Sequence, residues 1–124
     1  MKLRIKGDSL RLRLTRPEVE QLGTAGAVED RIHFAGGKVL MYRLKRDAEA
    51  VQLVASFADG VIEVRVPEAA ARQWCGTDQV ALDGTQSNGG TSLRILVEKD
   101  FACLKPREDE DESDNFPNPQ TTCG

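Results

Sequence analysis

The feature that most constrains the fold is a pattern that occurs twice in this chain of 124 residues. In each half, a segment that alternates apolar and polar residues runs into Pro-Glu, at Pro17-Glu18 and again at Pro67-Glu68. The alternation predicts a half-buried strand. Proline followed by an acidic residue predicts a helix start, because the missing N–H needs no partner there and the carboxylate suits the positive end of the helix dipole. A chain built twice on one plan is expected to fold as two related units.

The elements that follow the two Pro-Glu steps also correspond. Each unit is expected to contain a short helix, a strand and a longer strand, at Pro17–Leu22, Val28–Phe34 and Lys38–Arg46, and at Pro67–Trp74, Gln79–Asp83 and Thr91–Lys99. A glycine pair before the longer strand predicts a hairpin, because glycine adopts positive φ without strain. The spacing between matched positions is 50 residues at Pro-Glu and 53 at the glycine pairs, which predicts an insertion around residues 84–87.

Two more strands are expected outside this repeat. One leads the chain at Leu3–Lys6, and the other, Val51–Phe57, meets Val61–Val66 across Asp59-Gly60, a strong hairpin signal. We therefore predict a mainly β fold of about eight strands and two short helices. The repeat units, 10–47 and 60–100, are strand-helix-strand-strand units related by pseudo-twofold symmetry. They lie within a single domain, 1–106, and a small barrel or a sandwich would suit them, since closure removes exposed sheet edges.

Charge is distributed unevenly along the chain. Residues 1–46 hold eleven Lys and Arg against five Asp and Glu, whereas residues 108–124 hold six acidic residues and no basic ones. The net charge of −3 argues against nucleic-acid binding by the protein as a whole. The leading strands nevertheless predict a basic face made of Lys2, Arg4, Lys6, Arg11 and Arg13, because alternate residues of a strand point the same way.

The acidic segment 107–124 also contains an aromatic residue and two prolines, in Phe116-Pro117-Asn118-Pro119. Charge pairs at a surface contribute little by themselves, so an aromatic anchor is needed to hold such a tail. We expect residues 107–119 to fold back on the domain, with Phe116 buried.

Four residues are candidate ligands for a transition metal: Cys103, Cys123, His33 and Cys75. No two of them have the short spacing typical of zinc sites, so a site would have to be assembled from distant positions or between subunits. The alternatives are a small core residue at Cys75 and an exposed or hydrogen-bonded imidazole at His33. No cofactor is predicted, and a metal site remains one hypothesis.

Both ends of the chain resemble a family of small uncharacterised bacterial proteins. The likeness lies in the opening MKLRIKG (1–7), in EKDFACL (98–104) and in DESDNFPNP (111–119). It implies a bacterial, cytoplasmic protein whose tail belongs to the domain, and it implies no activity. At the level of pattern alone, the order of strand, Pro-Glu helix, glycine and hairpin is similar to the halves of swapped-hairpin and double-psi barrels, including the AbrB-type transcription factors.

Motifs for enzyme chemistry are not found. The chain has one His and lacks a nucleophile elbow, a P-loop and a zinc-protease motif. No apolar run approaches the ~18 residues of a membrane span, and the opening residues do not read as a signal peptide. An odd number of cysteines, three, favours the cytoplasm.

We therefore predict a small cytoplasmic, non-catalytic binding or accessory protein that acts through a protein partner or a small ligand. A homo-oligomer is compatible with either mode of action. The alternatives are an AbrB-like nucleic-acid binder that uses the basic leading strands, and a metal- or thiol-handling protein that uses the tail cysteines.

Overall fold

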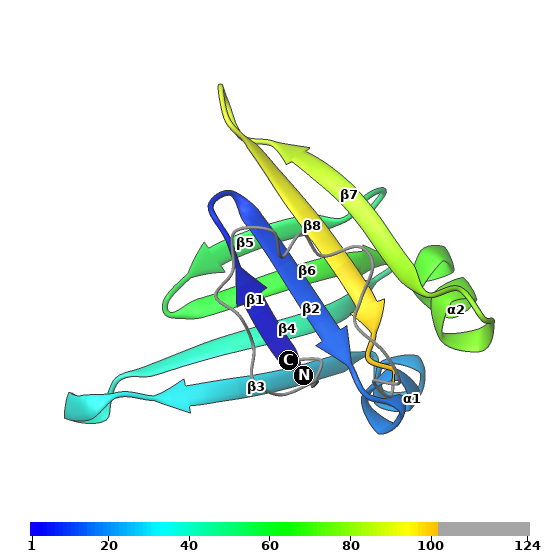
Figure 1. The fold of residues 1–124 in the computed structure, drawn as a ribbon, viewed down its shortest axis with the longest axis horizontal. Coiled ribbons are helices and arrows are strands. Elements are labelled where there is room, and N and C mark those ends of the chain that lie inside the picture. Colours follow the sequence, from blue (N-terminus) through cyan, green and yellow to red (C-terminus); the bar gives the residue numbers. More distant parts are fainter. Residues whose placement is uncertain (102–124) are drawn as a thin grey trace, which may run out of the picture.

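Two four-stranded sheets, with two helices packed together at one end, form the part of the chain that the structure describes, residues 1–101 of a computed structural model (Figure 1). The elements are β1 (Lys2–Ile5), β2 (Ser9–Leu14), α1 (Arg16–Ala25), β3 (Ala27–His33), a 3-10 turn η1 (Ala35–Gly37), β4 (Val39–Asp47), β5 (Val54–Ala58), β6 (Val61–Pro67), α2 (Glu68–Gly76), β7 (Ala81–Ser87) and β8 (Ser92–Lys99). The predicted mainly β fold, with eight strands and two helices in these residues, is confirmed.

The sheets have the orders β1-β2-β8-β7 and β3-β4-β6-β5. Four antiparallel hairpins join β1 with β2, β3 with β4, β5 with β6 and β7 with β8, whereas the central pairs, β2 with β8 and β4 with β6, are parallel. Each sheet therefore joins the hairpin before one helix to the hairpin after the other helix. Of the two predicted architectures, the described residues adopt the sandwich-like one and not a closed barrel.

The leading and central strands take equivalent places in the two halves of the described residues. β1 pairs with β2 as β5 pairs with β6. Both halves therefore have the order hairpin, helix, hairpin. The turn between β5 and β6 is the predicted one, with Asp59 at φ 53° and Gly60 at φ 76°. Two successive residues at positive φ match the twist of a two-residue hairpin.

Aligning Pro17 with Pro67 displaces the core positions of the two halves by two residues. Leu14 and Val66, both 0% exposed, are the last inward-facing residues of the strands before the helices. They are 52 residues apart, whereas the prolines are 50 apart. Pro17 lies inside the first turn of α1, after the N-cap Thr15, whereas Pro67 precedes α2 as its N-cap. Proline fits at both places because neither N–H would have a helical partner.

The predicted insertion lies elsewhere. Residues 84–87 belong to β7, and the extra residues lie in the loop 77–80, because α1 is joined to β3 by Gly26 alone. Two side chains bind this loop. Lys99 Nζ donates to the Thr77 carbonyl at 2.7 Å, and Trp74 Nε1 donates to the Val80 carbonyl at 3.0 Å. The loop is therefore held against the end of the sandwich that carries the helices.

A continuous core joins both sheets and both helices. Its buried hydrophobic members are aliphatic except for Trp74, as the low aromatic content of the chain requires. They are Leu12, Leu14, Val19, Leu22, Val28, Leu44, Leu53, Ala55, Val64, Val66, Ala71, Trp74, Leu82, Ile95 and Val97. Burying this apolar surface is the main favourable contribution to folding.

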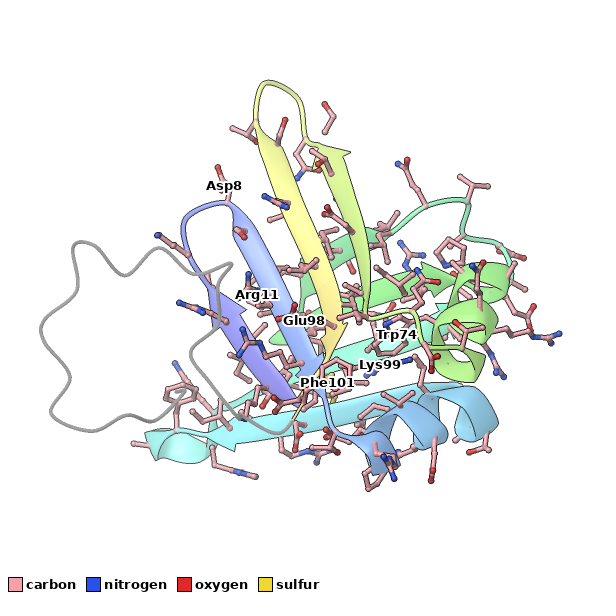
Figure 2. All side chains as sticks on the ribbon, turned by 45° about the vertical axis from the view of Figure 1, so that its right-hand side comes forward. Asp8, Arg11, Trp74, Glu98, Lys99 and Phe101 are labelled. Carbon is pink, nitrogen blue, oxygen red and sulfur yellow. The ribbon has the colours of Figure 1, made fainter. Side chains whose placement is uncertain are left out.

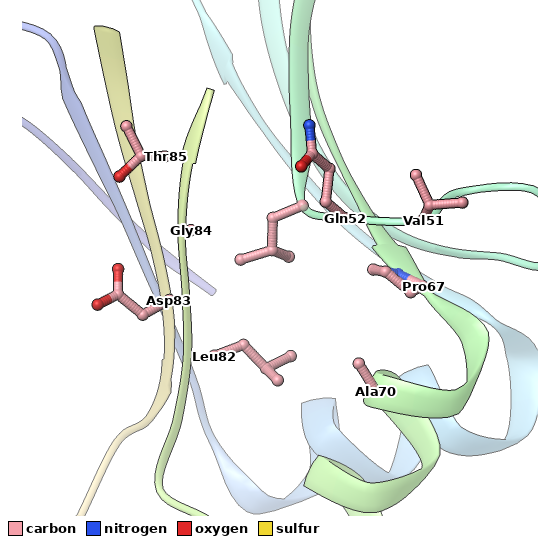
Figure 3. A pocket seen from close by; sticks show the side chains of 9 residues that line it. Val51, Gln52, Pro67, Ala70, Leu82, Asp83, Gly84 and Thr85 are labelled. Carbon is pink, nitrogen blue, oxygen red and sulfur yellow. The ribbon is translucent and has the colours of Figure 1, made fainter. Parts of the chain in front are cut away.

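Close packing makes Gly84 a sensitive position. A Cβ atom at Gly84 would lie 3.1 Å from Leu53 Cβ, beside the pocket shown in Figure 3. Gly84→Ala is therefore expected to lower the free energy of unfolding by about 1–3 kcal/mol, the usual cost of overpacking. Gly76→Ala is the matched control, since nothing lies within 4 Å of a Cβ there, and it is expected to be neutral or stabilising. Urea denaturation measures both, and equal effects of the two substitutions would contradict this packing.

Candidate functional site

A cleft of about 680 Å³ opens between the two sheets, at the end opposite the helices. The helices follow the carboxyl ends of β2 and β6, and the cleft lies at the amino ends of the four central strands. Its lining residues are Gly7, Asp8, Ser9, Leu10, Leu40, Ala55, Ser56, Phe57, Ile62, Gln86, Asn88 and Leu93.

Each central strand contributes one apolar side chain to this cleft. Leu10 and Ile62 lie near the starts of β2 and β6, and Leu40 and Leu93 lie near the starts of β4 and β8. The alternation of each strand directs these residues toward the space between the sheets. Phe57 of the edge strand β5 is also in the lining and is 70% exposed. The result is an apolar cavity with an aromatic ring in contact with water.

One wall of the cleft is held by Gln86. Its side-chain oxygen accepts a hydrogen bond from the Ala55 N–H at 2.7 Å, and its Nε2 donates to the Ala55 carbonyl at 3.0 Å. The amide thus bonds both backbone groups of one residue of β5, as a neighbouring strand would, and joins the edges β7 and β5. Nε2 also donates to Asn88 Oδ1 at 3.0 Å. Sequence analysis did not identify Gln86, because its partner is a backbone group that no side-chain pattern reveals.

The predicted basic face is found on the outer side of the sheet that contains β1, β2 and β8. Lys2 lies opposite Arg13, and Arg4 lies opposite Arg11, in the register of β1 with β2. Lys6 lies beyond β1, in the turn. In this register the cations of β1 stand directly opposite those of β2.

Arg13, however, is buried and not solvent-exposed. It is 7% exposed, and its Nε donates to Glu98 Oε1 at 2.6 Å. Arg11 Nε lies 3.5 Å from the same oxygen, so one carboxylate on β8 pairs with both guanidinium groups. Figure 2 shows Arg11 and Glu98 on neighbouring strands. Sequence analysis missed Glu98 because the parallel pairing of β2 with β8, which sets Arg13 opposite Glu98, joins distant parts of the chain.

The predicted metal ligands are not brought together in the described residues. His33 is exposed at the end of β3, and Cys75 lies in α2. The end of β3 and helix α2 lie on opposite sides of the molecule in Figure 1. Within residues 1–101, no three His, Cys, Asp or Glu side chains form a group that could hold a metal ion. Cys103, Cys123 and the tail anchor Phe116 lie outside the described residues.

The Cys75 thiol is half-buried between the helices, where Sγ donates to the Val19 carbonyl at 3.5 Å. Burial raises the pKa of this thiol, and the nearby cations Lys99 and Arg46 offset this only in part. In the Cys103→Ser, Cys123→Ser variant, we expect Cys75 to react with a disulfide reagent at pH 8 about tenfold more slowly than in urea, because the thiolate is the nucleophile. A reaction as fast in the folded as in the unfolded chain would show an accessible, activated thiol.

Comparison with known proteins leaves the activity open. No helix among the described residues is long and apolar enough to cross a membrane. No curated protein and no solved structure matches the chain, so the AbrB-type resemblance gains no support. The model of a family of unknown function, DUF7009, matches residues 1–120, in agreement with the expected family of uncharacterised proteins. The chain therefore belongs to the DUF7009 family.

Proposed function

We propose that this protein is a non-catalytic binding protein whose cleft between the sheets takes the apolar part of a small amphipathic ligand. The observation that carries the proposal is the convergence of four apolar side chains, one from each central strand, on an opening that leaves Phe57 exposed. Concave, mostly apolar sites with a few polar groups are typical of small-molecule binding.

The size and the polar groups of the cleft support this class of ligand. A volume of about 680 Å³ lies within the range of roughly 300–1,000 Å³ usual for small-molecule sites. Ser56, Asn88 and Asp8 are also in the lining. An apolar body would contact the leucine and isoleucine walls, while a polar end would bond Asn88 and Asp8 in the turns at the mouth of the cleft. Gln86 keeps one wall in place before binding, which lowers the entropic cost of association.

A binding role is favoured over catalysis by the chemistry of the lining. Asp8 is the one titratable residue among the described residues that line the cleft. General acid–base catalysis and nucleophilic catalysis both need a partner for such a group. Cys75 is the one cysteine among the described residues and is a free thiol there. This thiol and the odd number of cysteines in the chain support a reducing compartment, the cytoplasm, as the place of action.

Nucleic-acid binding through the basic face is less favoured. Arg11 and Arg13 both contact Glu98, so a phosphate would have to compete with a carboxylate that is already in place. Direct contacts of Lys and Arg with phosphates supply most of the affinity of non-specific nucleic-acid binding.

Filling the cleft tests the proposal. Leu40 is half-buried, lies in the lining and shares the inward face of β4 with the buried Leu44, so Leu40→Trp would occupy the space that a ligand needs. Titration with the neutral fluorescent probe N-phenylnaphthylamine is expected to show one site per chain in the wild type. Leu40→Trp is expected to weaken probe binding about tenfold or more, which corresponds to about 1.4 kcal/mol.

The matched control is Val39→Trp, because Val39 is the neighbouring residue of β4, is exposed on the opposite face and does not line the cleft. It is expected to bind the probe as the wild type does. Thermal unfolding of both variants checks that each one folds. Equal probe binding by Leu40→Trp and Val39→Trp would refute the cleft as the binding site.

A further inference from the structure

A compact group of four cations, which we call the basic block, lies on the outer face of the β1-β2-β8-β7 sheet. Lys2 and Arg4 of β1 lie directly opposite Arg13 and Arg11 of β2. Residues that face each other across antiparallel strands have Cβ atoms about 5 Å apart, and like charges in such pairs are destabilising. The basic block is therefore a place where negative charge stabilises the fold.

Two carboxylates at the end of β8 form ion pairs with cations of the basic block. Glu98 pairs with Arg13 at 2.6 Å and with Arg11 at 3.5 Å. Asp100 pairs with Lys2, with 3.1 Å between Nζ and Oδ2. Both carboxylates are therefore paired with cations of the basic block, and this face favours acidic side chains.

The chain leaves the described domain beside the basic block. The Asp100 N–H donates to the Leu14 carbonyl at 2.8 Å, which ties the end of β8 to the end of β2. Figure 2 shows Phe101 at the end of the strand that carries Glu98, next to the strand that carries Arg11. Whatever follows Phe101 therefore starts at the edge of this face.

The part of the sequence that follows has the charge and the reach to meet the basic block. Residues 108–114 hold six Asp and Glu and no Lys or Arg. The first of them is seven residues beyond Phe101, which allows about 23 Å of extended chain at ~3.3 Å per residue. The six residues of β2 span only about 20 Å, so every cation of the basic block is within reach.

We infer that the acidic segment 108–114 docks on the basic block of its own chain. A single exposed pair is weak, but several pairs act together, and a short tether raises the effective concentration to the millimolar range. The docked segment brings negative charge to cations that face one another across β1 and β2. It also occupies the face that any other polyanion would use, so the segment is an internal competitor. This inference concerns a different surface from the cleft, and it does not depend on the ligand proposed for that cleft.

Hydrogen exchange in the full chain tests the docking. In the wild type at low salt, amides of 108–114 are expected to exchange about tenfold more slowly than in a free peptide of the same sequence. Arg4→Glu with Arg11→Glu is expected to abolish this protection, and so is ~1 M salt, which reduces the screening length to about 3 Å. Arg13 is left unchanged because it is buried.

The matched control is Arg31→Glu with Arg72→Glu, which changes the net charge equally at two exposed positions on β3 and α2. It is expected to keep the protection. Exchange of 108–114 at the free-peptide rate in the wild type would overturn the inference. So would equal loss of protection in both double variants, since total charge and not the basic block would then be responsible.

A second measurement tests the competition. In the full chain with the six acidic residues of 108–114 changed to Asn and Gln, a fluorescent hexaglutamate peptide is expected to bind at least about tenfold more tightly than to the wild type. Adding Arg4→Glu and Arg11→Glu to this variant should remove the gain. Equal binding of hexaglutamate to wild type and neutralised tail would overturn the inference. Equal, tight binding of duplex DNA to both would overturn it as well, because the face would then be open to nucleic acid regardless of the tail.

Discussion

The parallel pairing of β2 with β8, and of β4 with β6, is the constraint on which the rest of the structure depends. Hairpins form between neighbours in sequence, but these two pairs join the first half of the chain to the second. Both begin in the same way: the Arg94 N–H donates to the Asp8 carbonyl and the Met41 N–H donates to the Gly60 carbonyl, each at 2.9 Å. Neither half can complete a sheet alone, so the two halves must fold as one cooperative unit.

Parallel pairing also makes the two ends of the sandwich different. Both central strands of a sheet run the same way, so each helix leaves its strand at the same end, where α1 and α2 pack together over Trp74 and Leu22. The opposite end has only turns. There the apolar side chains that start the central strands remain open to water and form the cleft. The proposed ligand site is thus a consequence of the strand directions.

The same pairing governs the electrostatics of the outer face. It sets Arg13 beside Glu98, and both residues are buried. Removing either one would therefore leave the other charge buried without its partner. Removing one member of a buried pair commonly costs about 3–5 kcal/mol. The β1-β2 hairpin, in contrast, brings cations to face cations. Carboxylates near these opposed cations reduce their repulsion, which accounts for the positions of Glu98 and Asp100. The proposed docking of the acidic tail would add carboxylates to the same face.

Local chemistry determined the strands, the hairpin at Asp59-Gly60 and the proline-led helices, because alternation, positive φ and helix capping depend on a few neighbouring residues. The shared face of Lys2 and Arg11 also followed from alternation. Only the tertiary structure decided that Arg13 is buried against Glu98, that Gln86 bonds the backbone of β5, and that the sheets stay a sandwich with one open end. Each of these features needs groups far apart in sequence to meet, and the free energy that brings them together comes from burying the whole core, which no local pattern encodes.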